Sequence, residues 1–381
     1  MGTDTLAPLG TTIAKIASET PPERGVILRF LLQEEAQRLL PDEKVFWCLR
    51  RLAPVNQRMG EKSPVYDHVE VHYDATKNHA SYRNLILCER LWICPVCASR
   101  ISEFRRQAIT QAINGSGLYS ALVTFTLQHR KHTPLAATLG TLSTAYRKFK
   151  SGRWWTDFVQ EWGWVGDIRA LEVTYGEHGW HPHFHVISLF NWFLGKQDVS
   201  RLENALKGRF GDVLRQSGGY ATYANGVTVK DDMQYARDYI AKFGRMPTHE
   251  DVKGWTIEHE LTGANRKVAR SKSGITPWGL LYQSAMGSKE SARLFLEFAN
   301  ATKGRNQVCW SRGLRSRLDM DSVETALQDQ ENSSIALLTI DKYWWTEICQ
   351  RRLRGQILAK VKEYHGDFAA IENWIIQEMK K

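Results

Sequence analysis

Short stretches in which apolar and polar residues alternate dominate the middle of the chain. Residues 118–127, 168–175 and 181–190 are rich in β-branched and aromatic side chains and predict strands. A Gly-Glu-His-Gly turn joins the second of these to the third, so the two together predict a hairpin. Residues 226–230 predict one more short strand.

Apolar residues at helical spacing fill the segments around these strands. The predicted helices cover residues 21–40, 98–113, 134–162, 198–217 and 232–243, and most of residues 250–305 and 315–381. The order strand, helix, hairpin, helix, strand, helix predicts an α+β fold. In such a fold a central antiparallel sheet is flanked by helices.

The same pattern suggests how the chain is organised. We expect an N-terminal lead (1–44), a cysteine-containing region with a helix (45–115), the α+β core (116–250), a helical continuation of that core (251–320) and a C-terminal helical module (321–381). No internal repeat or low-complexity tract interrupts these segments.

Composition narrows the class of protein. Hydrophobic residues make up 43% of the 381 residues, which supports a folded core rather than disorder. The formal net charge is +10, and a protein this basic usually meets a polyanion such as nucleic acid. No signal peptide and no apolar run long enough for a membrane span is evident, so we expect a cytoplasmic protein without a membrane partner.

The densest chemical signal is the run His181-Pro182-His183-Phe184-His185. Side chains alternate between the two faces of a strand, so the three imidazoles share one face. Two imidazoles at positions i and i+2 of a rigid strand are good ligands for a divalent metal. The alternative is a polar strand face whose histidines bind their neighbours.

The predicted hairpin adds a carboxylate to this face. If residues 176–179 form a four-residue turn, Glu172 lies directly opposite His183. Glu172, His183 and His185 would then form a two-histidine, one-carboxylate site that suits Mg²⁺ or Mn²⁺, with His181 as a second candidate ligand.

A second signal is a pair of tyrosines at helical spacing. Tyr235 and Tyr239 stand at positions i and i+4 and share one helix face, with Lys242 one turn beyond Tyr239. Such a pair is often core packing. Beside a metal site, however, a phenolate can attack a phosphodiester, and a lysine can stabilise the charge that develops. Neither a Walker phosphate loop nor a Gly-x-Ser-x-Gly elbow is present, so ATP use and acyl transfer have no support.

The cysteines predict a second metal site. Cys94 and Cys97 have the Cys-x-x-Cys spacing, Cys88 lies just before them and Cys48 lies in the same region. Four thiolates bind Zn²⁺ as a closed, tetrahedral structural site. A redox role for Cys-x-x-Cys lacks its βαβ context.

Arginines gather in clusters that could contact phosphates or simply keep helices soluble. The candidates for DNA contact are Arg100, Arg105, Arg106, Arg312, Arg315 and Arg317.

These features together resemble the HUH endonucleases, and in particular the rolling-circle replication initiators of plasmids. The first motif of that family resembles Leu122-Val123-Thr124-Phe125-Thr126, the second Trp180-His181-Pro182-His183-Phe184-His185-Val186, and the third Tyr239-Ile240-Ala241-Lys242. Flanking stretches are also similar, namely Cys88 through Cys94-Pro95-Val96-Cys97 and residues 301–305 through 310–314. The resemblance covers about residues 45–320.

The resemblance implies an enzyme that nicks single-stranded origin DNA. His183, His185 and Glu172 would hold the divalent ion, and Tyr239 would form a 5′-phosphotyrosine and leave a free 3′-OH before the strand is later rejoined. Many plasmid members carry a carboxylate where Tyr235 stands. A Tyr-x-x-x-Tyr pair instead resembles phage initiators and some single-strand transposases.

The implied partners are single-stranded DNA, a double-strand origin hairpin and a host helicase. Two other functions stay open at this point. One is a transposase or conjugative relaxase with the same chemistry, and the other is a zinc-containing DNA-binding protein whose histidines and tyrosines are structural. A covalent adduct on a labelled single-stranded oligonucleotide separates the second from the enzymes.

Overall fold

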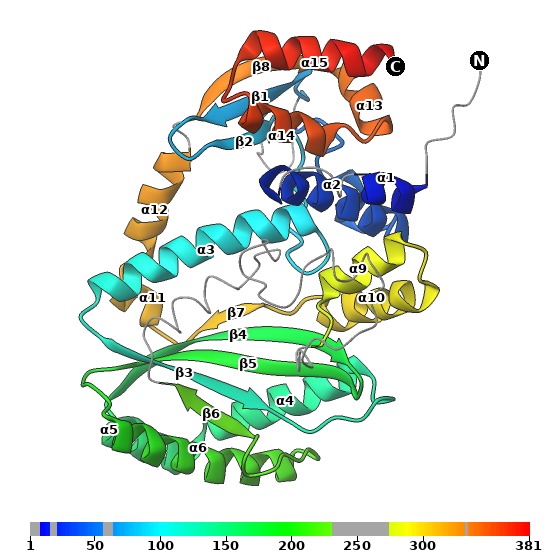
Figure 1. Cartoon of the computed structure of the whole chain (residues 1–381). Helices are drawn as coiled ribbons and strands as arrows, with labels where there is room; N and C mark the ends of the chain where they lie inside the picture. The colour runs from blue at the N-terminus through cyan, green and yellow to red at the C-terminus, as the bar shows by residue number, and fades with distance from the viewer. Residues whose placement is uncertain (1–7, 16–20, 56–63, 231–273, 332–333) are drawn as a thin grey trace.

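Two antiparallel sheets organise the protein (Figure 1). The structure is a computed structural model that describes residues 8–15, 21–55, 64–230, 274–331 and 334–381. The larger sheet has the strand order β6-β3-β5-β4-β7, and the smaller has the order β2-β1-β8. Mixed α and β structure with antiparallel sheets agrees with the α+β prediction.

The larger sheet is built around one long hairpin. Its strands are β3 (Tyr119–Thr126), β4 (Trp164–Gly176), β5 (Gly179–Phe190), β6 (Val227–Lys230) and β7 (Val308–Trp310). The hairpin pairs Tyr175 with Trp180 and Glu172 with His183, so the register predicted from the turn is confirmed. Both strands extend further than predicted, because ladder pairing continues from Gly176 and Gly179 out to Trp164 and Phe190.

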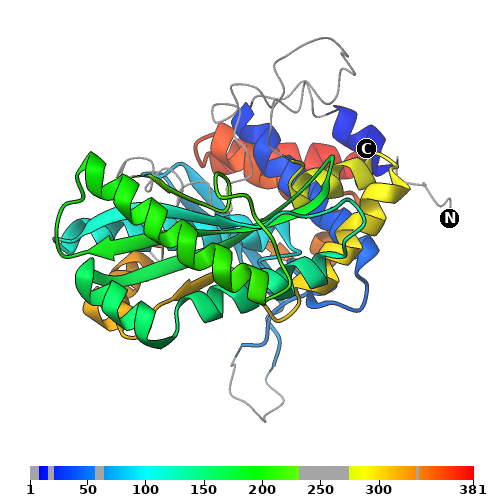
Figure 2. The same cartoon turned by 90° about the horizontal axis from the view of Figure 1, so that it is seen from below.

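Helices cover one face of this sheet. They are α4 (Leu135–Phe149), α5 (Gly152–Glu161) and α6 (Lys196–Gln216), and they lie in front of the sheet when the molecule is seen from below (Figure 2). Phe125 of the sheet packs against Phe149 of α4 and Phe210 of α6, and all three side chains are buried. The single helix predicted over residues 134–162 is two helices, and Gly152, with a φ of +76°, begins the second.

The described residues cover the opposite face of the sheet only in part. The helix α3 (Pro95–Gly115) packs Ile109 and Ile113 against Leu122 of β3 and Ile187 of β5. The short helices α11 (Leu314–Arg317) and α12 (Met320–Glu331) extend this apolar layer. Further along β5 the apolar residues on this face give way to His185, His183 and His181. The part of this face beyond α3 therefore carries the polar side chains.

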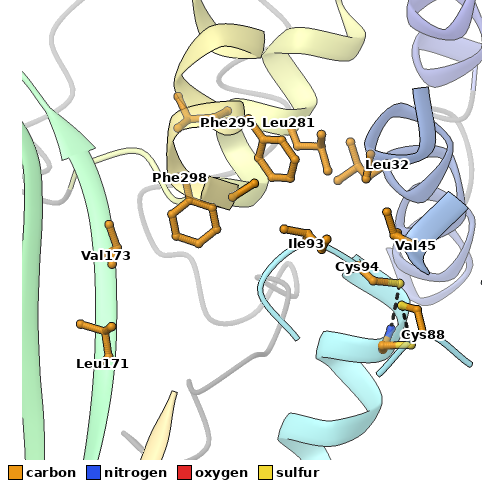
Figure 3. Close-up of a cluster of buried hydrophobic side chains, with 14 of the residues drawn as sticks. Leu32, Val45, Cys88, Ile93, Cys94, Leu171, Val173, Leu281, Phe295 and Phe298 are labelled. Carbon is orange, nitrogen blue, oxygen red and sulfur yellow. Dashed lines mark hydrogen bonds between the residues drawn. The ribbon is translucent and has the colours of Figure 1, made fainter. Parts of the chain in front are cut away.

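Two further helices connect the sheet to the cysteine region. They are α9 (Pro277–Ala285) and α10 (Lys289–Thr302). Phe298 of α10 lies between Leu171 and Val173 of β4 on one side and Ile93 on the other, and Ile93 directly precedes Cys94 of the cysteine cluster (Figure 3). One continuous core thus joins the sheet to the cysteine region.

The smaller sheet brings the two ends of the chain together. Its strands are β1 (His68–Asp74), β2 (His79–Arg83) and β8 (Ile335–Asp341), and the helices around it are α1 (Leu9–Lys15), α2 (Pro21–Leu39), the short 3₁₀ helix η2 (Lys44–Trp47), α13 (Lys342–Gln350), α14 (Arg354–Glu363) and α15 (Phe368–Lys380). The C-terminal segment, which we expected to be helical, thus contributes a strand that pairs with β1. A Cβ at Gly355 would meet the Ile27 backbone at 2.8 Å, so glycine allows α14 to approach α2 closely.

In the described parts of the chain, every helix is too short or too polar to cross a bilayer.

Candidate metal centre

Three ligand-type side chains meet on the face of the larger sheet that α3 packs against, beyond the end of its apolar layer. Glu172 lies on β4, and His183 and His185 lie on β5. Nε2 of His183 and Nε2 of His185 each lie 3.0 Å from the same carboxylate oxygen, Oε2 of Glu172. Neighbouring ligands of an octahedral ion with bonds near 2.1 Å lie about 3.0 Å apart. The spacing therefore suits one divalent cation held by all three residues.

Hydrogen bonds on the far side of each ring fix its orientation. Nδ1 of His183 lies 3.3 Å from the carbonyl oxygen of His181, and Nδ1 of His185 lies 3.0 Å from Oγ1 of Thr124 on β3. A carbonyl oxygen only accepts, so Nδ1 of His183 donates to it, and in the neutral imidazole Nε2 then presents a lone pair. A lone pair and a carboxylate oxygen at 3.0 Å repel each other unless a cation or a proton lies between them. Metal-binding histidines commonly donate the hydrogen of their other ring nitrogen to such a fixed acceptor.

The environment favours the protonation states that a metal requires. Burial lowers the pKa of His185 to about 4, so its ring is neutral at neutral pH. Burial raises the pKa of the Glu172 carboxyl, but its contacts with His183 and then His185 outweigh burial and hold that pKa well below its usual range. Neutral imidazole and ionised carboxylate are the forms that bind a divalent ion.

The third histidine of the strand has a different surrounding. Nε2 of His181 lies 2.8 Å from Oγ1 of Thr126, and the His181 ring stacks on His129 with 4.7 Å between ring centroids. The convergent group includes Glu172 but not His181. The Glu172 side chain is 37% exposed, so the site opens to solvent on that side. An open position is what a substrate oxygen would need.

A second convergent group consists of four thiols. Cys48, Cys88, Cys94 and Cys97 are buried, and their sulfurs lie within 4.8 Å of one another. The Sγ–Sγ distances are 3.5 Å from Cys48 to Cys97, 3.6 Å from Cys88 to Cys97 and 3.8 Å from Cys94 to Cys48. The edge of a ZnS₄ tetrahedron with 2.3 Å bonds is about 3.8 Å long. These distances are too long for disulfides and close to those of a tetrathiolate zinc site.

Hydrogen bonds to sulfur support this interpretation. Cys94 caps α3, and its Sγ accepts from the backbone N–H of Cys97 at 3.5 Å and from Nε2 of Gln33 at 3.3 Å. Sγ of Cys48 accepts from the backbone N–H of Cys88 at 3.4 Å. Burial raises the pKa of the Cys94 thiol well above its usual value, so a thiolate there requires a cation. The four residues fit Zn²⁺.

The two candidate tyrosines cannot be placed relative to these groups. Tyr235, Tyr239 and Lys242 lie outside the described residues, and their catalytic roles stay predictions.

The candidate DNA-binding arginines have varied surroundings. Arg106 binds Glu103 through two nitrogens, and Arg315 binds Glu324 and lies over the ring of Trp310. Arg312 and Arg317 are exposed, and Arg105 is half-buried. The guanidinium of Arg100 lies 4.0 Å from Glu89. The DNA-binding roles of these arginines stay predictions.

Sequence reasoning did not identify Thr124 and Thr126 as partners of the histidines. Both lie on β3, where they pair with His185 and His183 in the strand ladder. The sequence did indicate that both threonines share one face of the strand, because they alternate with apolar residues along it. The register against β5 could not be derived, because no short turn joins β3 to β5.

Comparison with known proteins gives limited similarity. The sequence matches no protein family profile, and no solved structure matches. The chain is 28% identical to "Protein rep" of Streptomyces lividans, over 64% of this chain and 66% of that protein. It is 30% identical to "Neomycin resistance protein" of Streptomyces cyanogenus, over 33% of this chain and 35% of that protein. The chain therefore spans less than two thirds of the length of either relative.

Proposed function

We propose that this protein is a replication initiator that nicks single-stranded DNA with a tyrosine and stays joined to the 5′ end. The observation that carries the proposal is the convergence of Nε2 of His183 and Nε2 of His185 on Oε2 of Glu172. The net charge of +10 supports a nucleic-acid substrate. The similarity to a protein named "Protein rep" supports a role in replication.

In this proposal the divalent ion, when bound, polarises the scissile phosphate and orients it for in-line attack. Glu172, His183 and His185 hold the ion, and Thr124 holds the ring of His185 in the orientation that ligation needs. Mg²⁺ and Mn²⁺ suit this mixed nitrogen and oxygen ligand set.

The covalent step belongs to Tyr239. Its phenolic oxygen loses a proton and bonds to phosphorus, while the bond from phosphorus to the 3′ oxygen breaks. The 3′ oxygen takes up a proton and leaves as a free 3′-OH. Rejoining reverses these steps, since a 3′-OH attacks the phosphotyrosine and releases the phenol. Lys242 stabilises the developing charge.

We further propose that Cys48, Cys88, Cys94 and Cys97 bind one structural Zn²⁺. The support is the match between their sulfur spacings and a tetrahedral site. All four cysteine sulfurs would bind the ion and complete its tetrahedral coordination, so the ion would have no open position for substrate.

Incubation with end-labelled single strands tests the main proposal. We expect a protein–DNA adduct on a denaturing gel that requires Mg²⁺ or Mn²⁺ and disappears with EDTA. Oligonucleotides that tile the replicon carrying this gene provide the candidate origin sequences.

The outcomes separate the competing functions. DNA binding without any adduct, under every metal condition, would instead support a non-catalytic zinc-containing DNA-binding protein. An adduct that transfers its strand to an unrelated second end would support a transposase.

A further inference from the structure

A polar pocket of about 280 Å³ adjoins the strand β4, which carries Glu172. Its walls come from the loop before α3, from α3 itself and from the segment between α10 and β7. The volume is close to the lower end of the range for ligand pockets. It suits an object about as large as one nucleotide.

The walls of this pocket are basic and offer unused hydrogen-bonding groups. Four basic and two acidic side chains line it. The two acids, Glu43 and Glu89, have basic neighbours in Lys303 at 2.7 Å and Arg100 at 4.0 Å.

Three arginines of the pocket have no such partner. Within the part of the chain that the structure describes, no acidic group lies within 4.0 Å of Arg90, Arg105 or Arg305. The side-chain amides of Asn306 and Gln307 likewise make no hydrogen bond to another described residue. The pocket thus presents cations and amides to a ligand that carries negative charge and hydrogen-bonding edges.

The thiol cluster builds one wall of the pocket. Arg90 and Trp92 lie on the loop between Cys88 and Cys94, and Sγ of Cys88 accepts from the backbone N–H of Arg90 at 3.5 Å. Nε1 of Trp92 donates to the carbonyl of Arg305 at 2.7 Å, which ties this loop to the opposite wall. The Trp92 ring also packs edge-on against Phe298 of α10. The aromatic wall is therefore held in place from both sides.

Two residues of the pocket also line a second cavity that touches the metal centre. Arg105 and Gln307 line this pocket and also a small cavity of about 20 Å³ that touches His185. The carbonyl of Gln307 accepts from the backbone N–H of Leu171, the residue before Glu172. Adjacent strands lie about 4.8 Å apart, so Gln307 is about one strand spacing from the backbone that carries Glu172. The small cavity has room for about one water molecule and cannot hold a base, whereas the larger pocket can.

We propose that this pocket binds one unpaired base of the DNA strand next to the phosphate at the metal centre. In this arrangement Arg105 contacts the intervening backbone phosphate, Trp92 provides an aromatic face, and Gln307 and Asn306 bind the edge of the base. Amide side chains can form two hydrogen bonds with a base edge, which gives sequence preference. Base stacking on aromatic side chains and arginine contacts to phosphate are common in single-strand binding. The inference rests on the proposed function, because it identifies how that site selects its substrate.

Cleavage of a randomised single strand tests the pocket. A 40-nucleotide strand with randomised positions is incubated with protein and Mn²⁺, and the ends of the cleaved products are sequenced. We expect the wild-type protein to prefer one base at a position adjoining the cleaved phosphate. Gln307→Ala should reduce that preference about tenfold and leave the preferences at other positions unchanged. Gln111→Ala, an exposed glutamine on α3, is the matched control.

A binding measurement without cleavage provides an independent readout. In EDTA, an abasic site at the preferred position should weaken binding of the strand to the wild-type protein about tenfold. The same abasic site should have little effect on Arg90→Ala combined with Gln307→Ala. Arg153→Ala combined with Gln111→Ala is the control, because Arg153 is exposed on α5. Competition by free mononucleotides at similar concentrations would point to a nucleotide site and overturn the proposal.

Different results would refute the pocket proposal and the nickase proposal. If the protein nicks DNA but Gln307→Ala keeps the wild-type base preference, the pocket proposal is wrong and the nickase proposal stands. If no strand is nicked while the pocket variants still lose base-dependent binding, the pocket stands and the nickase proposal is wrong.

Discussion

The hydroxyl oxygen of Thr124 lies 3.0 Å from Nδ1 of His185, across the ladder that joins β3 to β5. This contact leaves Nε2 of His185 facing Glu172. A threonine that no sequence motif singled out as a metal partner thus orients a candidate ligand.

Thr124→Val removes this hydrogen bond and nearly preserves the shape of the side chain. Loss of such a supporting contact typically costs 10- to 100-fold in metal affinity. We therefore expect Mn²⁺ to bind about tenfold more weakly in calorimetric titration, with little change in thermal unfolding. Thr228→Val is the control, since Thr228 pairs with Thr124 from β6 and is exposed. Equal losses in both variants would argue against a specific role for Thr124.

The double variant His183→Ala, His185→Ala should lose the divalent-ion site. We expect no stoichiometric Mn²⁺ binding and no nicking, because only Glu172 of the three ligand-type side chains remains. His178→Ala, in the exposed hairpin turn, should bind and nick like the wild type. Full activity of the double variant would refute the proposed site.

Purified protein should contain about one tightly bound zinc per chain. Elemental analysis measures this, and the metal should remain after the Mn²⁺ site has been stripped with mild chelation. Cys94→Ser should lower thermal stability, because Cys94 supplies a sulfur and also caps α3. The matched control is Cys349→Ser, since Cys349 lies outside the cluster. A folded, active preparation without zinc would contradict the prediction.

Tyr239→Phe should abolish the covalent adduct while the protein still folds, because only the hydroxyl is lost. Tyr235→Phe should still nick but should impair release or joining of the displaced strand. Mass spectrometry of the adduct identifies the modified tyrosine. A phosphotyrosyl peptide carrying only Tyr235, together with a fully active Tyr239→Phe variant, would reverse the assignment. If Tyr235→Phe completes the whole cycle, termination uses water and a carboxylate base.

Arg354 should be important for stability rather than chemistry. Its buried guanidinium binds Gln33 and Glu34 of α2 and the carbonyls of Cys48 and Leu49. Arg354→Leu removes a buried donor to all four of these groups, although Glu34 keeps Arg50 at 3.2 Å, and breaking a buried ion pair costs about 3–5 kcal/mol. We expect a loss of that size in the free energy of unfolding measured with urea. Arg153→Leu, at a side chain that is 94% exposed, should change it by less than about 1 kcal/mol.

The sequence alone predicted the elements that depend on local patterns. Alternation of side chains gave the histidine face, and the length of the turn gave the pairing of Glu172 with His183. Both follow from the period of a strand and from hairpin geometry, which involve residues close together in the chain. The Cys-x-x-Cys spacing likewise pointed to a metal site before any fold was known.

Tertiary structure alone decided the contacts between distant segments. In the sequence, β8 is a short apolar run between predicted helices. Only its pairing with β1, about 260 residues earlier, makes it a strand. Cys48 reaches the other three thiols because α2, η2 and the loop before α3 pack together. Thr124 meets His185, and Arg105 and Gln307 line the same pocket, for the same reason. Such contacts depend on which surfaces of the whole chain fit each other, and no local period or turn length encodes that fit.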